Sequence, residues 1–181
     1  MHTENELSVK NIIIVSGASD AGTQSVVVAL RRSILEAGCS AEHLRWQGCA
    51  AEHSLSCASC QNDGQCAQAD PADLALKRVK AADASVFIVD ETACGASSFW
   101  LPLLLRFKEE PGLILKQRYL VITSAARALL PLQMTELMQK AARDLQASWS
   151  SITLICAGSP EQAQNQALIL GQQWARRLAG E

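Results

Sequence analysis

Short apolar runs alternate along the chain with longer segments whose apolar residues recur at helical spacing. The run Ile12-Ile13-Ile14-Val15 has no polar position among its β-branched residues, which is typical of a strand buried on both faces of a sheet. Comparable runs follow at intervals, although the next one, at residues 42–46, mixes polar and apolar residues. The pattern predicts strands at residues 11–16, 42–46, 85–89, 118–123 and 151–156.

Amphipathic segments separate these strands. The first carries Val26, Leu30 and Ile34 at helical spacing and stops at Gly38. Strands that alternate with helices indicate an α/β fold whose parallel sheet is covered on both faces. We expect residues 1–181 to form one domain, with a polar tail at 1–9 and a cysteine-rich loop at 48–70. The predicted helices cover residues 22–37, 71–82, 97–108, 131–149 and 160–178.

The length and charge narrow the class of protein. A chain of 181 residues, 49% of them hydrophobic, can bury one sizeable core but is short for two domains. Its 16 basic and 18 acidic residues give a net charge of -2 without any block of like charge, so neither nucleic acid nor a membrane surface is expected as a partner. The polar start of the chain has no signal-peptide pattern, and we therefore expect a cytoplasmic protein.

The loop after the first predicted strand, residues 16–25, has the composition of a phosphate-binding loop. Gly17 and Gly22 allow close backbone approach, and the following helix presents free N–H groups at its start. The loop matches neither the P-loop nor the dinucleotide-binding glycine pattern. An ordinary capped turn has the same composition, and the carboxylate of Asp20 would repel a phosphate. The candidate phosphate-binding residues are Ser16, Ser19, Thr23, Gln24 and Ser25.

Four of the seven cysteines, Cys49, Cys57, Cys60 and Cys66, lie in the cysteine-rich loop. In a reducing compartment the last three can be inert thiols, a redox pair, or ligands of zinc or an iron–sulfur cluster completed by Cys49 or His53. Inert thiols are the simplest interpretation, because the fourth ligand has no regular place in the spacing. We therefore assign no metal-binding residue.

The order of these features resembles the NADPH-dependent FMN reductase and iron–sulfur flavoprotein group of the flavodoxin-like superfamily. The loop from Gly17 to Ser25, the cysteine segment, Asp70, and the pair Ala82-Asp83 before the third strand occur in the order and nearly the spacing of that group. Leu170-Gly171 also occurs in the last helix, as it does there. With the strand–helix alternation, the resemblance predicts a doubly wound, five-stranded parallel sheet of order 2-1-3-4-5.

The resemblance implies an FMN site with degenerate loops. The phosphate would bind at the first loop, and the flavin ring would lie near the loop after the third strand. That loop lacks the proline and the aromatic residue usual in the group and carries Asp90 and Glu91 instead, so FMN binding is expected to be weak or partial. The residues expected near the ring are Thr92, Ala93, Cys94, Gly95 and Ala96.

The function implied is transfer of hydride or electrons from NAD(P)H, with NADPH as a possible donor, to a small-molecule or protein acceptor. The alternative is a non-catalytic scaffold or assembly protein that has lost flavin binding, with or without a metal in its cysteine-rich loop. FMN would carry the chemistry, so no side chain is assigned a catalytic role. His43 and His53 are expected to be exposed loop histidines. The very apolar helix at 97–108, which contains Phe99 and Trp100, predicts a homodimer.

Overall fold

The computed structural model describes residues 9–17, 21–46, 71–90, 116–124, 150–156 and 159–180. Among the described helices, none combines the length and the apolar character needed to cross a membrane. The helices and strands in chain order are β1 (Asn11–Ser16), α1 (Ala21–Glu36), β2 (Ser40–Arg45), α4 (Pro71–Ala81), β3 (Ala84–Asp90), β4 (Gln117–Ser124), β5 (Ser151–Cys156) and α7 (Pro160–Ala179).

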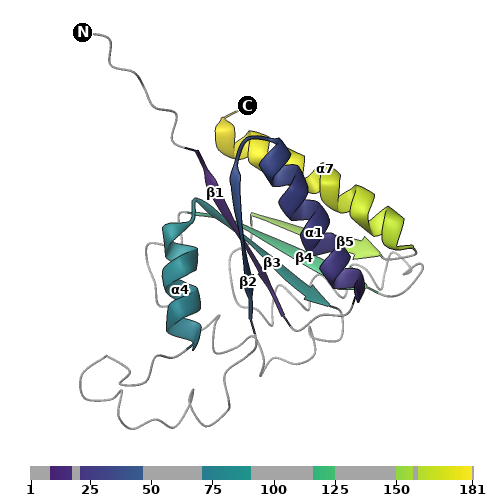
Figure 1. Ribbon diagram of the computed structural model, residues 1–181, viewed down its shortest axis with the longest axis horizontal. Helices are drawn as coiled ribbons and strands as arrows, with labels where there is room; N and C mark the ends of the chain where they lie inside the picture. Colours follow the sequence, from purple (N-terminus) through teal and green to yellow (C-terminus); the bar gives the residue numbers. More distant parts are fainter. Residues whose placement is uncertain are drawn as a thin grey trace, which may run out of the picture.

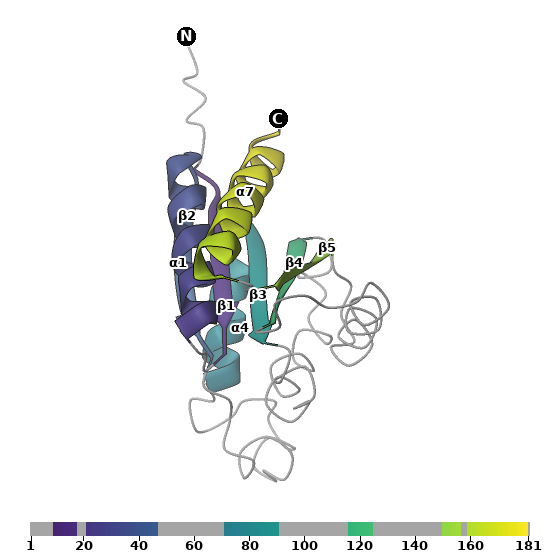
Figure 2. The same ribbon diagram turned by 90° about the vertical axis from the view of Figure 1, so that its right-hand side faces the viewer.

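The five strands form one sheet in the order β2-β1-β3-β4-β5, with every neighbouring pair parallel. This confirms the flavodoxin-like order predicted from the sequence. Figure 1 shows α1 and α7 side by side across one face of the sheet, with α4 apart from them next to the β2 side. In the side view of Figure 2, α1 and α7 lie next to each other on one side of the molecule, and β4 and β5 lie on the other.

β1 lies inside the sheet and is buried on both faces. Its residues Ile12 to Val15 are each 0% exposed, as the continuous apolar run predicts. Ile12 and Ile14 belong to the main apolar cluster, which also contains residues of α1 and α7. β1 therefore anchors the layer on which α1 rests.

α7 begins and ends where its sequence signals place it. The side chain of Ser159 caps the helix by accepting a hydrogen bond from the N–H of Gln162 at 3.2 Å, and Pro160 occupies the first turn. Gly180 ends the helix with a φ of 88°, a conformation that glycine adopts without strain. The buried residues of α7 then face α1 and the sheet, and they include Gly171 and Trp174.

The second strand differs from its predicted bounds. It covers Ser40–Arg45 instead of residues 42–46, because the N–H of Ser40 donates to the carbonyl of Lys10 and pairing starts there. β2 is at the edge of the sheet and its residues are half-buried or exposed, so its apolar pattern is weak. The predicted helices at 97–108 and 131–149 lie outside the described residues, and the homodimer proposed from the first of them stays a prediction.

Asp83 joins the entry of β3 to the start of β1. Its Oδ2 accepts a hydrogen bond from the N–H of Asn11 at 2.8 Å, its own N–H donates to the Asn11 carbonyl, and Oδ1 lies 3.3 Å from Nζ of Lys10. The Asn11 hydrogen bond, followed by the charge of Lys10, lowers the pKa of Asp83 below its ordinary value. The ionised carboxylate therefore stabilises the folded chain.

Asp83→Ala is expected to lower the free energy of unfolding at pH 7 by about 1 kcal/mol, a modest value because the side chain is 38% exposed. With a lowered pKa in the folded state, this contribution is present above the ordinary pKa and is lost as the pH falls through the folded value. Urea unfolding of both proteins at pH 7 and near pH 3 measures the difference. A difference that is equal at the two pH values would contradict the assignment to the charged carboxylate.

Candidate functional site

The carboxyl ends of the strands define one edge of the sheet. Ser16 ends β1 and pairs with Ile88, while Asp90 ends β3 and pairs with Thr123 of β4. β1 is flanked by β2 and β3, so the strand order reverses at β1, and ligands bind at such a switch point in open parallel sheets. The candidate site lies at this edge.

The first turn of α1 lies at the same edge. α1 begins at Ala21, shortly after β1 ends, and Figure 1 shows its start at the end of the sheet marked by the arrowhead of β3. Its first turn contains no acidic residue, so nothing within it neutralises the positive end of the helix dipole. Free N–H groups at a helix start suit an anion such as a phosphate.

Ser16 is fully buried at the end of β1. Its Oγ is 2.9 Å from Nε2 of His43, and its carbonyl accepts a hydrogen bond from the N–H of Trp46 at 2.7 Å. In the neutral ring that leaves Nε2 unprotonated, the hydroxyl of Ser16 donates to His43. The Ser16 proton is then directed to β2 instead of toward the crevice.

His43 was expected to be an exposed loop histidine, and this expectation is wrong. It lies within β2, opposite Ile14 of β1, and is half-buried. Burial and then the nearby charges of Arg31 and Arg45 lower its pKa, so the neutral ring is favoured at physiological pH. The parallel register pairs Ser16 with Arg45 and so places His43 two residues before that partner, which no local sequence pattern reveals.

Thr23 connects α1 to the sheet from inside. Its Oγ1 is 2.9 Å from Oγ1 of Thr123 in β4, and both side chains are buried. The Thr123 hydroxyl is also 3.4 Å from the carbonyl oxygen of Val89 in β3. These contacts fix the start of α1 over the ends of β3 and β4, and Thr123 is a site residue that the sequence analysis did not identify.

Of the remaining predicted phosphate-binding residues, Ser25 donates its hydroxyl to the carbonyl of Gly22 at 2.7 Å, within the first turn of α1. Gln24 is half-buried in the same turn. The structure thus brings Ser16, Thr23, Gln24 and Ser25 to one edge of the sheet. Ser19 lies outside the described residues. So do the residues predicted to bind the flavin ring, which are Thr92, Ala93, Cys94, Gly95 and Ala96.

The arrangement gives two kinds of donor for an anion at this edge. The first turn of α1 presents its N–H groups at this edge, whereas the hydroxyls of Ser16, Thr23 and Ser25 are already hydrogen bonded within the protein. Each hydroxyl has one proton and two acceptor positions, so it must rotate to donate outward. An anion at this edge would therefore be held mainly by the backbone of that turn.

No protein-family model matches the chain, and no curated protein matches its sequence. Among solved structures, it is similar to a flavone reductase with a TM-score of 0.60 at 16% identity; the match covers 93% of this chain and 63% of that one, so the chain spans less than two thirds of the reductase's length.

Two further solved structures match nearly over their whole length. An NAD(P)H:quinone oxidoreductase from Methanothermobacter marburgensis has a TM-score of 0.60 at 14% identity, with 94% of this chain and 100% of that chain covered. A flavodoxin from the domain Archaea has a TM-score of 0.50 at 13% identity, with 93% and 99% covered. At these identities the likeness establishes the flavodoxin-like fold.

Proposed function

We propose that the chain is an FMN-binding oxidoreductase that passes hydride or electrons from NAD(P)H to a small-molecule or protein acceptor. The observation that carries the proposal is the placement of α1, whose start lies at the ligand-binding edge of a 2-1-3-4-5 sheet with no acidic residue in its first turn. The similarity to a flavone reductase and an NAD(P)H:quinone oxidoreductase supports it.

The described residues fit a flavin phosphate. The N–H groups of the first turn of α1 would bind it, with Thr23 and Ser16 at the base of the site. Thr23 can donate outward when Thr123 donates to it, and Thr123 then gives up its contact with the Val89 carbonyl. Ser16 can donate outward when His43 donates to Ser16 instead of accepting from it.

FMN supplies hydride and electron transfer when it is bound. The chain would hold the phosphate, orient the flavin and keep water from the buried base of the site, where Ser16 and Thr23 are 0% and 2% exposed. We assign no acid–base catalyst. The hydroxyls of Ser16, Thr23 and Ser25 must exchange their internal hydrogen-bond partners before they can donate to a phosphate. In the sequence, Asp20, Asp90 and Glu91 add negative charge near the site. FMN binding is therefore expected to be weak.

Calorimetric titration with FMN tests the proposal. Thr23→Val keeps the side-chain shape but removes a hydroxyl that can donate to the phosphate, so the affinity is expected to fall about two- to tenfold. Thr123→Val is the matched control, because it removes the same internal hydrogen bond while leaving the Thr23 hydroxyl in place. Its affinity should equal or exceed that of the parent protein.

The outcomes separate the candidate functions. A loss in Thr123→Val as large as in Thr23→Val would mean that the threonine pair acts only through the fold. Tight binding by the parent protein would contradict the weakened site, and no binding at millimolar FMN would favour a non-catalytic scaffold. Where FMN binds, the loss of flavin absorbance on adding NADH or NADPH identifies the electron donor.

A further inference from the structure

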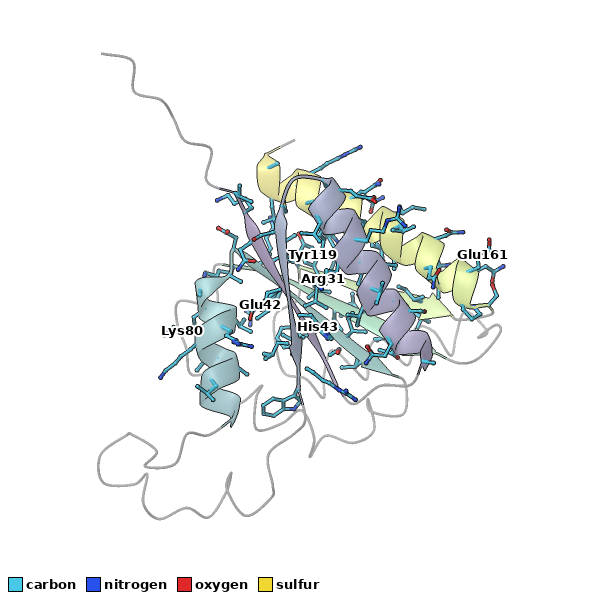
Figure 3. The ribbon with its side chains drawn as sticks, in the orientation of Figure 1. Arg31, Glu42, His43, Lys80, Tyr119 and Glu161 are labelled. Atoms are coloured by element: carbon cyan, nitrogen blue, oxygen red, sulfur yellow. The ribbon has the colours of Figure 1, made fainter. Side chains whose placement is uncertain are left out.

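A shallow hollow runs along β2 beside α1, away from the start of that helix. Its volume is about 520 Å³, and its lining includes Arg31 of α1 and His43 of β2. Arg45 is two residues beyond His43 in the same strand, so it projects from the same face of the sheet. Figure 3 shows Arg31 and His43 close together where α1 crosses β2. The other lining residues are Asn11, Ser40, Ala41 and Glu42.

The positive charge on this face has no neutralising carboxylate among the described residues. Arg31 and Arg45 form no ion pair with any described side chain. The nearest acidic side chain along β2, Glu42, is 3.4 Å from Nε of Arg78 in α4, and Figure 3 shows it on the side of β2 toward that helix. Two guanidinium groups and an imidazole thus share one face.

The contact of His43 with Ser16 leaves the other ring nitrogen, Nδ1, as a hydrogen-bond donor. Ser16 of β1 lies against Nε2, and in the neutral tautomer that accepts the Ser16 proton, Nδ1 carries the ring hydrogen. Asn11 and Ser40 at the far end of the hollow are joined to each other by a hydrogen bond of 2.9 Å. Guanidinium groups pair with phosphate oxygens through two parallel hydrogen bonds, which matches Arg31 and Arg45 to that class of anion.

We propose that Arg31, His43 and Arg45 form a binding face for a second phosphate group, which adjoins the flavin phosphate site at Ser16, the register partner of Arg45. Arg31 lies about 15 Å along α1 from Ala21, since an α-helix rises about 1.5 Å per residue. The phosphate belongs either to the free ion or to a phosphorylated nucleotide. Its negative charge would favour the protonated ring of His43, which then donates to Ser16 and turns the Ser16 hydroxyl outward.

The test follows the His43 ring by NMR as the pH is varied, with its signal assigned through His43→Asn. Burial and then the charges of Arg31 and Arg45 lower the pKa of this ring, and Glu42 is the one acidic side chain among the described residues that line the hollow. A bound phosphate should therefore raise the titration midpoint. The probes are inorganic phosphate and adenosine 2′,5′-bisphosphate, each compared with sodium chloride at the same ionic strength. Equal affinities indicate the free ion, and a tighter nucleotide indicates the phosphorylated ligand.

Arg31→Gln and Arg45→Gln are each expected to weaken phosphate binding about two- to fivefold, the range of partly exposed charge pairs. Arg32→Gln is the matched control, because Arg32 is adjacent on α1 but is paired with Glu36 at 2.7 Å; its affinity should not change. A midpoint that phosphate does not move, or equal affinities in all three variants, would overturn the proposal.

Repeating the phosphate titration with saturating FMN distinguishes binding at this face from binding at the flavin site. If phosphate still raises the His43 midpoint, the ion occupies the face on β2. If FMN abolishes the effect, the ion was bound at the start of α1 and the proposed face is refuted, while the flavin function stands. If FMN does not bind at all, the flavin function fails and the phosphate titration remains decisive for this face.

Discussion

Trp174→Ala is expected to lower the free energy of unfolding by about 3–5 kcal/mol, the usual cost of removing a buried aromatic side chain. Trp174 is 2% exposed in α7 and stacks on Tyr119 of β4, with ring centroids 4.5 Å apart and an angle of 17° between the planes. Tyr119 is itself fully buried, so the truncation leaves a cavity between the helix and the sheet. Urea unfolding measures the loss as a lower midpoint at unchanged slope.

Ile169→Ala on the same helix is the control. Ile169 is 56% exposed, and its truncation should change the free energy of unfolding by no more than about 0.5 kcal/mol. Trp174→Phe keeps an aromatic ring over Tyr119 and should recover more than half of the loss seen in Trp174→Ala. If the two alanine variants proved equally stable, the stacked pair would not belong to the core.

The sheet could be predicted because its inner strands have continuous apolar runs, which indicate that both of their faces are buried. Ile12 to Val15 are apolar at every position because both faces of β1 are covered, and the same holds for residues 86–89 of β3 and 119–122 of β4. Helix signals such as Ser159, Pro160 and Gly180 act locally, so the bounds of α7 were also predictable. The order of the strands followed from the alternation of strands and helices together with the resemblance to the flavodoxin-like group.

The edge strand was harder to predict for a physical reason. β2 has one neighbour in the sheet and keeps polar residues such as Ser40 and His43 on its half-buried surface. Its start is set by a hydrogen bond from Ser40 to Lys10, a partner far away in the sequence. Such a bond leaves no periodic pattern near residue 40, so the predicted bounds were displaced.

The residues of the candidate site could be predicted from the sequence, but the hydrogen bonds that they form could not. Ser16, Thr23, Gln24 and Ser25 were selected because hydroxyls and a helix start suit a phosphate, and the structure places them at one edge. The direction of each hydroxyl depends on residues distant in sequence: Thr123 is 100 positions from Thr23, and His43 is 27 from Ser16. The register of β1 and β2 brings His43 to Ser16, and the packing of α1 on the sheet brings Thr23 to Thr123.

Gly171→Ala is expected to destabilise the chain by about 2 kcal/mol, although alanine is the better helix former by about 1 kcal/mol. A Cβ at position 171 would lie 1.9 Å from Oγ of Ser33 and 3.1 Å from the carbonyl oxygen of Leu30. Ser33 is 0% exposed and its hydroxyl donates to that same carbonyl, so the Oγ can move only by breaking this hydrogen bond, and the carbonyl only by moving α1. Overpacking should therefore exceed the gain in helix propensity.

A double-mutant cycle identifies the contact responsible. Ser33→Ala removes the oxygen at 1.9 Å but leaves the Ser33 Cβ position, 3.2 Å from the added methyl group, so the double variant should recover about half of the loss. Gln172→Ala, at the exposed neighbouring position of α7, should stay within about 0.5 kcal/mol of the parent protein. If Gly171→Ala were as stable as the parent, α1 and α7 would have room to separate, and the close approach at Gly171 would not determine how the two helices pack over the sheet.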